Sequence, residues 1–395
     1  MAAYSLSPDD YDLKTIIGNG CGNCAKVWLA SHKPTGNTVA VKITNLDSSA
    51  DFNQLQNEVH MGRELRHPNI LQLHTVFMQG NEMWQVMPLA AFGSCRDLLQ
   101  AHFTQGLREE ACTYILRDLL QALDYMHQQG IIHRGVRGSH ILISATGEVK
   151  LAGFRQCLPM LNEGVRFQVV HNFPDNFVQS LLWASPELLE QNIAGYDTKS
   201  DIYSVGITAC ELANGIVPFS DVPLTQMLLE KIEGITPQLM DYTTVPEMAP
   251  DGVSGQSGPN DEAPDGSASG QTPRRFSAHF HEFVALCLHN DPKIRPSASA
   301  LLQHSFFKQI KRRSSLASLP ELLHPVLPIT QIPNLPCGLA QEKEDHLHTS
   351  SLLLASECGS KDMKPSRNKV IADRGIAEEI LPVQVEITGR SYQRN

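Results

Sequence analysis

The sequence lacks long apolar runs and an excess of basic residues. No stretch of eighteen or more apolar residues occurs, so we expect no membrane-spanning helix. The 32 Lys and Arg residues against 42 Asp and Glu give a net charge of −10, which offers no electrostatic support for nucleic-acid binding. The first ten residues have neither a basic region nor an apolar core, so we expect no secretory signal there.

Cysteines are few and have no framework spacing. Nine are scattered along the chain, an odd number that favours a reducing compartment over a disulfide scaffold. Cys21 and Cys24 form one C-x-x-C pair, but no second pair follows, so a loop is a better interpretation than a zinc or redox site. A length of 395 residues allows one domain of about 300 residues and a tail.

Hydrophobic periodicity divides the chain into a β-rich part and a helical part. Residues 11–45 predict three strands around a Gly-rich loop, and residues 51–66 have helical spacing. Within residues 70–90 we expect two more strands, around 70–73 and 83–87. From residue 94 onward helices dominate, and the strongest amphipathic patterns cover residues 108–129, 200–214 and 278–290.

Composition sets the expected boundaries. We expect an extension at residues 1–10, a domain at 11–310 and a flexible tail at 311–395. The domain divides into a smaller lobe, 11–90, and a larger one, 91–310. Residues 245–274 are rich in Gly, Ser, Pro and Asp and cannot bury much apolar surface, which indicates a flexible insertion.

The most informative motif is HRGVRGSH at residues 133–140. It matches the protein kinase catalytic loop H-R-D-L-K-x-x-N, but Gly135 replaces the Asp that accepts the substrate proton and His140 replaces the metal-binding Asn. Gly153 replaces the metal-binding Asp of D-F-G. A positioned general base contributes about 10²–10⁴ in rate, and both metal ligands are lost as well. We therefore expect no catalytic residues and no metal site.

Other kinase motifs are retained in their usual order. Lys42 ends the strand VAVK and Glu58 is its expected ion-pair partner, while Glu187, Asp201 and Arg295 match structural positions of the larger lobe. These motifs predict an α+β, bilobal protein kinase fold. The expected nucleotide-binding residues come from the Gly-rich loop, two strands, the helix, the interlobe hinge and the altered motifs: Gly18, Gly20, Val27, Ala40, Lys42, Glu58, Met87, Ala90, His140 and Arg155.

The altered motifs leave three functions open. Arg155 and His140 would place cationic or proton-accepting groups where phosphates and metal would lie, so we hypothesise that they replace the metal and that ATP binds without magnesium. Retention of Lys42 and Glu58 keeps open a residual or unconventional kinase. A scaffold that binds no nucleotide is the third alternative.

Residues 133–144, 199–213 and 304–313 resemble the STRAD pseudokinases, the sterile-twenty-related adaptors, and Gly153-Phe154-Arg155 is similar to that family's Gly-Leu-Arg. The resemblance extends from about residue 11 to about residue 325. It implies an inactive adaptor that binds ATP and activates an LKB-type tumour-suppressor serine/threonine kinase in a heterotrimer with a helical-repeat scaffold of the calcium-binding-protein-39 type. It also implies cytoplasmic and nuclear localisation, retention of the kinase in the cytoplasm, and an activation segment presented as a pseudosubstrate.

Some features depart from that family or have two interpretations. Lys42 stands where some members have Arg, Gly135 replaces the usual Ser, and the family's final Trp-Glu-Phe, which docks in the scaffold, is not found. In the activation segment, residues 155–184, aromatic and basic side chains serve either an interface or local packing: Arg166, Phe167, His171, Phe173 and Phe177. The run KRRSS at 311–315 suits a basophilic kinase or is a solvated basic helix end.

Overall fold

The computed structural model describes residues 4–20, 24–47, 52–162, 164–174, 177–244, 274–310 and 314–332. All of them belong to one compact unit, Met1–Gln341. Cys21, most of the expected insertion, the basic residues 311–313 and the tail after residue 332 lie outside the described residues. In the described part, no helix has the length and apolar character needed to cross a membrane.

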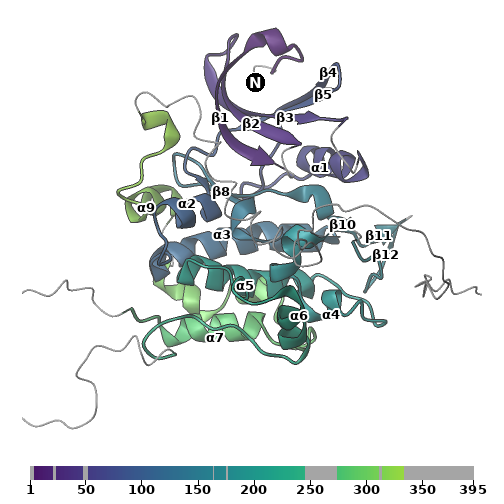
Figure 1. Cartoon of the computed structure of the whole chain (residues 1–395), viewed down its shortest axis with the longest axis vertical. Helices are drawn as coiled ribbons and strands as arrows, with labels where there is room; N and C mark the ends of the chain where they lie inside the picture. The colour runs from purple at the N-terminus through teal and green to yellow at the C-terminus, as the bar shows by residue number, and fades with distance from the viewer. Residues whose placement is uncertain are drawn as a thin grey trace, which may run out of the picture. The chain divides into compact units, whose positions relative to one another are not determined.

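The smaller lobe is an antiparallel five-stranded sheet with one helix (Figure 1). Its strands lie in the order β1-β2-β3-β5-β4, and alternate side chains such as Val39, Val41 and Val86 are buried together with Tyr11 and Trp84. The bounds are β1 (Tyr11–Gly20), β2 (Ala25–His32), β3 (Asn37–Asn45), α1 (Phe52–Glu64), β4 (Thr75–Gln79) and β5 (Glu82–Pro88).

One predicted strand is wrong. Residues 70–73 form no strand, and β4 lies at Thr75–Gln79. The apolar side chains of Ile70 and Leu71 are buried, but Leu71 donates its backbone N–H to Leu151 of the larger lobe instead of joining the sheet. A short buried run between the lobes has the same periodicity as a buried strand, so the pattern could not separate them.

The larger lobe is built mainly of helices (Figure 1), most of which pack around its main apolar core. Its predicted helices are confirmed as α3 (Glu109–Gln128), α5 (Lys199–Asn214) and α7 (Ala278–Cys287). The other helices are α2 (Cys95–Ala101), α4 (Pro186–Leu189), α6 (Leu224–Ile232), α8 (Ala298–Leu301) and α9 (Ser315–Leu322). The short strands are β6 (Gly93–Ser94), β7 (Ile131–Ile132), β8 (Ile141–Ile143), β9 (Val149–Leu151), β10 (Leu158–Pro159), β11 (Leu161–Asn162) and β12 (Val165–Arg166).

Helix α9 lies in the segment that composition suggested was a flexible tail. Leu319 and Leu323 are fully buried in the core of the larger lobe, next to α3. The segment mixes Pro, Ser and charge, so its apolar residues give no long periodic signal, and only their tertiary contacts reveal the helix.

Candidate functional site

An apolar cluster joins the sheet to the larger lobe at the place expected for a nucleotide base. Val27, Ala40 and Met87 come from β2, β3 and β5, and they pack in one cluster with Leu142 from β8. The sequence motifs predicted the first three but not Leu142. Its signal was weak, because an apolar residue two positions after His140 is equally expected in a core strand.

The two glycines of the predicted Gly-rich loop lie at the end of β1. Gly18 pairs with Val27 and Gly20 with Ala25, so Val27 occupies the strand position that the sequence indicated. A Cβ atom on Gly20 would lie 3.4 Å from Cε of Lys42, so the end of β1 lies close to this lysine. Ala90 follows the end of β5 at Pro88, which completes the predicted hinge.

Glu58 lies between two cations. Its Oε1 is 2.5 Å from Nζ of Lys42, which confirms the predicted ion pair, and its Oε2 accepts a hydrogen bond of 2.8 Å from Nε of Arg155. Burial alone would raise the pKa of Glu58, but Lys42 and Arg155 outweigh it and lower this pKa. Arg155, which we expected beside the phosphates, thus ties α1 to the altered D-F-G turn.

Asn57 strengthens the same junction. Its side-chain amide donates to the backbone carbonyls of Phe154, Arg155 and Cys157 at 3.3, 3.0 and 2.8 Å. Two neighbouring residues of α1 therefore hold the 3₁₀ turn Phe154–Gln156 in place. The sequence motifs gave no signal for Asn57, since an amide on a helix surface is ordinarily solvated.

His140 makes its contacts within the altered catalytic loop. Its Nδ1 lies 2.6 Å from the carbonyl oxygen of Gly135, and its Nε2 lies 3.0 Å from a guanidinium nitrogen of Arg137. The carbonyl can only accept and the guanidinium can only donate, so the ring is neutral with its proton on Nδ1. Burial, followed by the charge of Arg137, lowers the pKa of His140 well below its usual value.

The His140 ring also occupies the position of the missing side chain at residue 153. A Cβ atom on Gly153 would lie 2.3 Å from Nδ1 of His140, and Gly153 has φ +85°, a conformation that favours glycine. A Cβ on Gly135 would contact the same nitrogen at 3.5 Å. The three altered positions therefore form one packed unit in which the imidazole lies against two glycines.

This unit does not suit a magnesium ion. Magnesium prefers oxygen ligands in octahedral geometry, whereas Gly135 and Gly153 have no side chain and both ring nitrogens of His140 already have partners. Across the part of the chain that the structure covers, no group of three or more His, Cys, Asp or Glu side chains is placed to hold a metal.

Asp201 at the start of α5 orders the catalytic-loop backbone, as predicted. It accepts hydrogen bonds of 2.8 Å from the backbone N–H groups of His133 and Arg134. Arg134 has φ 58°, unusual for a residue with a side chain, and donates to Gln156, Asn172 and Tyr196. These bonds connect the loop, the altered D-F-G turn and the activation segment.

The predicted pair Glu187–Arg295 is confirmed and is buried. Both guanidinium NH groups donate to the carboxylate, at 2.7 and 2.8 Å. Burial alone would raise the pKa of Glu187, but hydrogen bonds and charge from Arg295 lower it. The pair attaches the end of the activation segment to the larger lobe.

In the activation segment, some of the predicted side chains pack locally and others are exposed, as an interface would require. Phe173 and Phe177 pack locally around Tyr196, and Arg166 donates to the backbone carbonyls of His127 and Gln128 at the end of α3. His171 lies 2.9 Å from the carbonyl oxygen of Ile193. Phe167 stays 47% exposed, and three neighbouring apolar side chains are also exposed: Leu161, Val165 and Val169.

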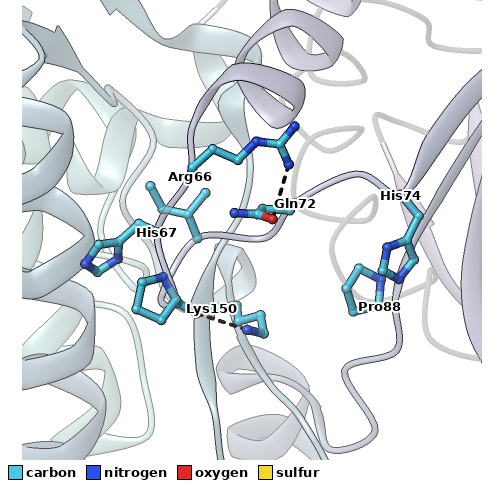
Figure 2. A pocket seen from close by; sticks show the side chains of 8 residues that line it. Arg66, His67, Gln72, His74, Pro88 and Lys150 are labelled. Atoms are coloured by element: carbon cyan, nitrogen blue, oxygen red, sulfur yellow. Dashed lines mark hydrogen bonds between the residues drawn. The ribbon is translucent and has the colours of Figure 1, made fainter. Parts of the chain in front are cut away.

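A separate pocket of about 390 Å³ contains none of the predicted site residues. Figure 2 shows the hydrogen bond from Arg66 to Gln72 on its wall and the side chains of His67, His74, Pro88 and Lys150 around it. A smaller pocket of about 270 Å³ lies at the end of α5, where Asn214, Phe219 and Met240 contribute to its lining.

Comparison with known proteins agrees with this geometry. The protein kinase domain family matches residues 11–307. STE20-related kinase adapter protein alpha of Homo sapiens is 50% identical over 344 residues, 84% of this chain and 80% of the relative. The Gallus gallus alpha protein is 48% identical over 347 residues, covering 83% and 89%. STE20-related kinase adapter protein beta of Homo sapiens is 40% identical over 367 residues, 87% of both chains. Together with the altered but fully framed kinase site, these matches show that the chain belongs to the protein kinase domain family and, within it, to the STE20-related kinase adapter proteins.

Proposed function

We propose that this chain is a catalytically inactive adaptor that acts through its conformation. In this proposal it binds ATP and activates an LKB-type serine/threonine kinase in a heterotrimer with a calcium-binding-protein-39-type scaffold. It would act in the cytoplasm and nucleus and retain the kinase in the cytoplasm. The adapter names of the relatives support an adaptor function.

The observation that carries the proposal is the position of His140. Its ring lies where the side chain of residue 153 would have to be, so the loss of the metal-binding carboxylate is built into the packing. Gly135 offers no general base to an acceptor hydroxyl. Phosphoryl transfer depends on metal and positioning, so both requirements are unmet.

ATP binding is supported by the parts of the site that remain. The cluster of Val27, Ala40, Met87 and Leu142 has the apolar character of a base-binding surface, and Lys42 lies beneath the Gly-rich loop with its positive charge. When bound, ATP would supply a base that contacts both lobes and phosphates that face Lys42. We propose binding without magnesium because the altered unit offers no suitable oxygen ligand.

Partner activation follows from linkage. If ATP, the scaffold and the partner kinase all prefer the closed form, each strengthens the binding of the others. The contacts of Asn57, Glu58 and Arg155 already hold α1 against the D-F-G turn. The exposed apolar residues around Phe167 give the activation segment a surface for the partner kinase.

The first test separates an adaptor from a residual kinase, which the Lys42–Glu58 pair still favours. Purified protein is incubated with labelled ATP and either magnesium or manganese, and phosphate transfer is measured. We expect none above a blank. Transfer that disappears in the Lys42→Met variant would contradict the adaptor proposal.

The second test addresses ATP and the partner. Thermal unfolding is measured with ATP, with and without magnesium, and we expect stabilisation in both conditions; no shift in either would remove ATP from the proposal. Co-purification with the LKB-type kinase, with and without the scaffold, is followed by assay of that kinase. An unchanged kinase activity in the complex would exclude activation.

A further inference from the structure

Helix α9 is attached to the larger lobe through close contacts. Leu319 and Leu323 are fully buried in the core of the larger lobe, where α9 contacts α3. The loop before β9 also approaches closely, since a Cβ on Gly147 would lie 2.7 Å from both Pro320 and the carbonyl oxygen of Ser315. The Gly147 backbone therefore lies directly against α9.

Ser315 is the first residue of α9 and is buried against a carboxylate. Its side chain is 6% exposed, and its hydroxyl hydrogen-bonds with Asp118 of α3, which is 3% exposed. Arg117 pairs with the same carboxylate at 2.7 Å. Because Asp118 is buried, its pKa is raised above the usual value, although Arg117 and Ser315 lower it in part.

The sequence around Ser315 suits a kinase that selects basic peptides. Arg312 and Arg313 precede the serine by three and two positions, and the apolar Leu316 follows it. Two arginines that precede an acceptor serine in the sequence complement the acidic substrate groove of such a kinase. Ser314 has the same basic run, but there the arginines lie one and two positions away.

We propose that Ser315 is a phosphorylation site for a basophilic protein kinase and that its phosphorylation releases α9 from the larger lobe. The Ser315 oxygen attacks the γ-phosphorus of ATP in the modifying kinase. The bond from the γ-phosphorus to the β,γ-bridging oxygen breaks, ADP leaves, and the base of that kinase takes the hydroxyl proton. Nothing in this step depends on nucleotide binding by the chain itself.

Electrostatics and volume both oppose a phosphate on docked Ser315. The group brings a charge of about −1.5 to −2, and it would lie beside the Asp118 carboxylate in a desolvated place. Arg117 can offset only part of this charge, because it already pairs with Asp118. The hydroxyl is also accessible only when α9 is undocked, so phosphorylation would trap the released form.

A phosphate on Ser314 is expected to have the opposite effect on the docking of α9, so Ser314 provides the matched control. Its side chain is exposed, and its hydroxyl oxygen accepts a hydrogen bond from the backbone N–H of Leu316 at the start of α9. A phosphate there would be solvated and would lie at the positive end of the helix dipole, which favours the helix. The two adjacent serines therefore have opposite expected effects on docking.

Release of α9 would also affect the hinge, because the chain that follows the helix is hydrogen-bonded to it. After the helix, the backbone N–H of Ile329 donates to the carbonyl oxygen of Ala91 at 2.7 Å, one residue after Ala90 of the hinge. The modification would therefore change protection at two places that are far apart in the sequence, residues 315–332 and the hinge.

The test uses the full chain with the catalytic subunit of the cyclic-AMP-dependent kinase and ATP. Mass spectrometry localises the phosphate, and hydrogen exchange measures residues 315–332 and the hinge. We expect phosphate on Ser315 and exchange at least about tenfold faster in both segments. The Ser314→Ala variant should behave in the same way, and Ser315→Ala should keep slow exchange.

A second variant tests access. Leu319→Ala removes a fully buried side chain of α9, so undocking and Ser315 phosphorylation should both become more than about tenfold faster. Phosphate on Ser314 alone, in a reaction that modifies a peptide of residues 308–320 at Ser315, would overturn the proposal. Full phosphorylation of Ser315 with unchanged exchange would also overturn it, and so would equal phosphorylation rates for the wild type and Leu319→Ala.

Discussion

The altered catalytic centre and the frame around it have opposite chemistry. In the frame, the retained charges are paired, Lys42 with Glu58 and Arg295 with Glu187, and Arg155 of the altered D-F-G turn adds a second cation at Glu58. In the centre, two glycines replace carboxylates and a neutral imidazole fills the space.

This difference indicates that the molecule retains the contacts that hold its fold in place and not the catalytic carboxylates. A buried carboxylate without a partner destabilises the folded state. A centre that kept its aspartates without a metal would therefore have a lower free energy of unfolding. Replacement of the two carboxylates by Gly135 and Gly153 removes this cost, and the neutral His140 ring fills the space. The paired charges of the frame hold α1, the catalytic loop and the activation segment together.

The largest expected effect comes from breaking the frame. Arg295→Met leaves Glu187 buried without its cation, and we expect the free energy of unfolding to fall by about 3–5 kcal/mol, as measured with urea. Lys150→Met is the control, because its 3.4 Å contact with the exposed Glu148 and its 2.9 Å hydrogen bond to the carbonyl oxygen of Pro68 should each contribute about 1 kcal/mol or less. Equal losses in the two variants would mean that the Glu187–Arg295 pair has no special role.

The next effect comes from refilling the centre. Gly153→Asp adds a side chain at φ +85° that collides with the His140 ring, and we expect a loss of about 2–3 kcal/mol in urea unfolding. His140→Ala should relieve the collision, so a double-mutant cycle should show a coupling of about 1 kcal/mol or more. Gly36→Asp is the control, with φ +70° and open space around it. Additive effects of the Gly153 and His140 substitutions would contradict the packed unit.

A smaller and more local effect is expected at α1. Glu58→Gln weakens the bonds to Lys42 and Arg155 and should cost about 2 kcal/mol. Hydrogen exchange should become faster in α1 and in residues 154–157. Glu64→Gln, on an exposed position of the same helix, should leave exchange unchanged. If both variants behave alike, the Glu58 contacts do not hold the helix.

The smallest effect is a dependence on pH. The pKa of His140 is lowered in the folded protein, so the unfolded chain binds a proton first as the pH falls below about 6.5. Stability should therefore decrease on acidification, by about 1.4 kcal/mol per pH unit from this group. His140→Gln should reduce the slope of urea stability between pH 7 and pH 5, whereas the exposed His102→Gln should not. An unchanged slope in His140→Gln would argue against a buried neutral ring.

The sequence predicted those site residues that lie at a fixed spacing within the kinase motifs. Lys42, Glu58, Glu187, Asp201 and Arg295 were identified because each occurs at a set distance from other kinase residues, and all make the expected contacts. Asn57 and Leu142 were missed, since a helix amide and a strand leucine have no distinctive pattern. The expected strand at 70–73 failed because burial between lobes has the same periodicity as burial in a sheet.

The amino-acid sequence by itself determined the bilobal fold, the family and the loss of the catalytic groups, because these depend on which residues occur at which spacing. Only the tertiary structure decided where the replacements lie. His140 could have faced a phosphate, but the glycine at 153 opened a space that its ring fills. Arg155 pairs with Glu58, and α9 packs on the larger lobe with the Ser315 hydroxyl at Asp118. Such choices depend on which partners the fold brings within a few ångströms, and no local pattern of residues encodes that distance.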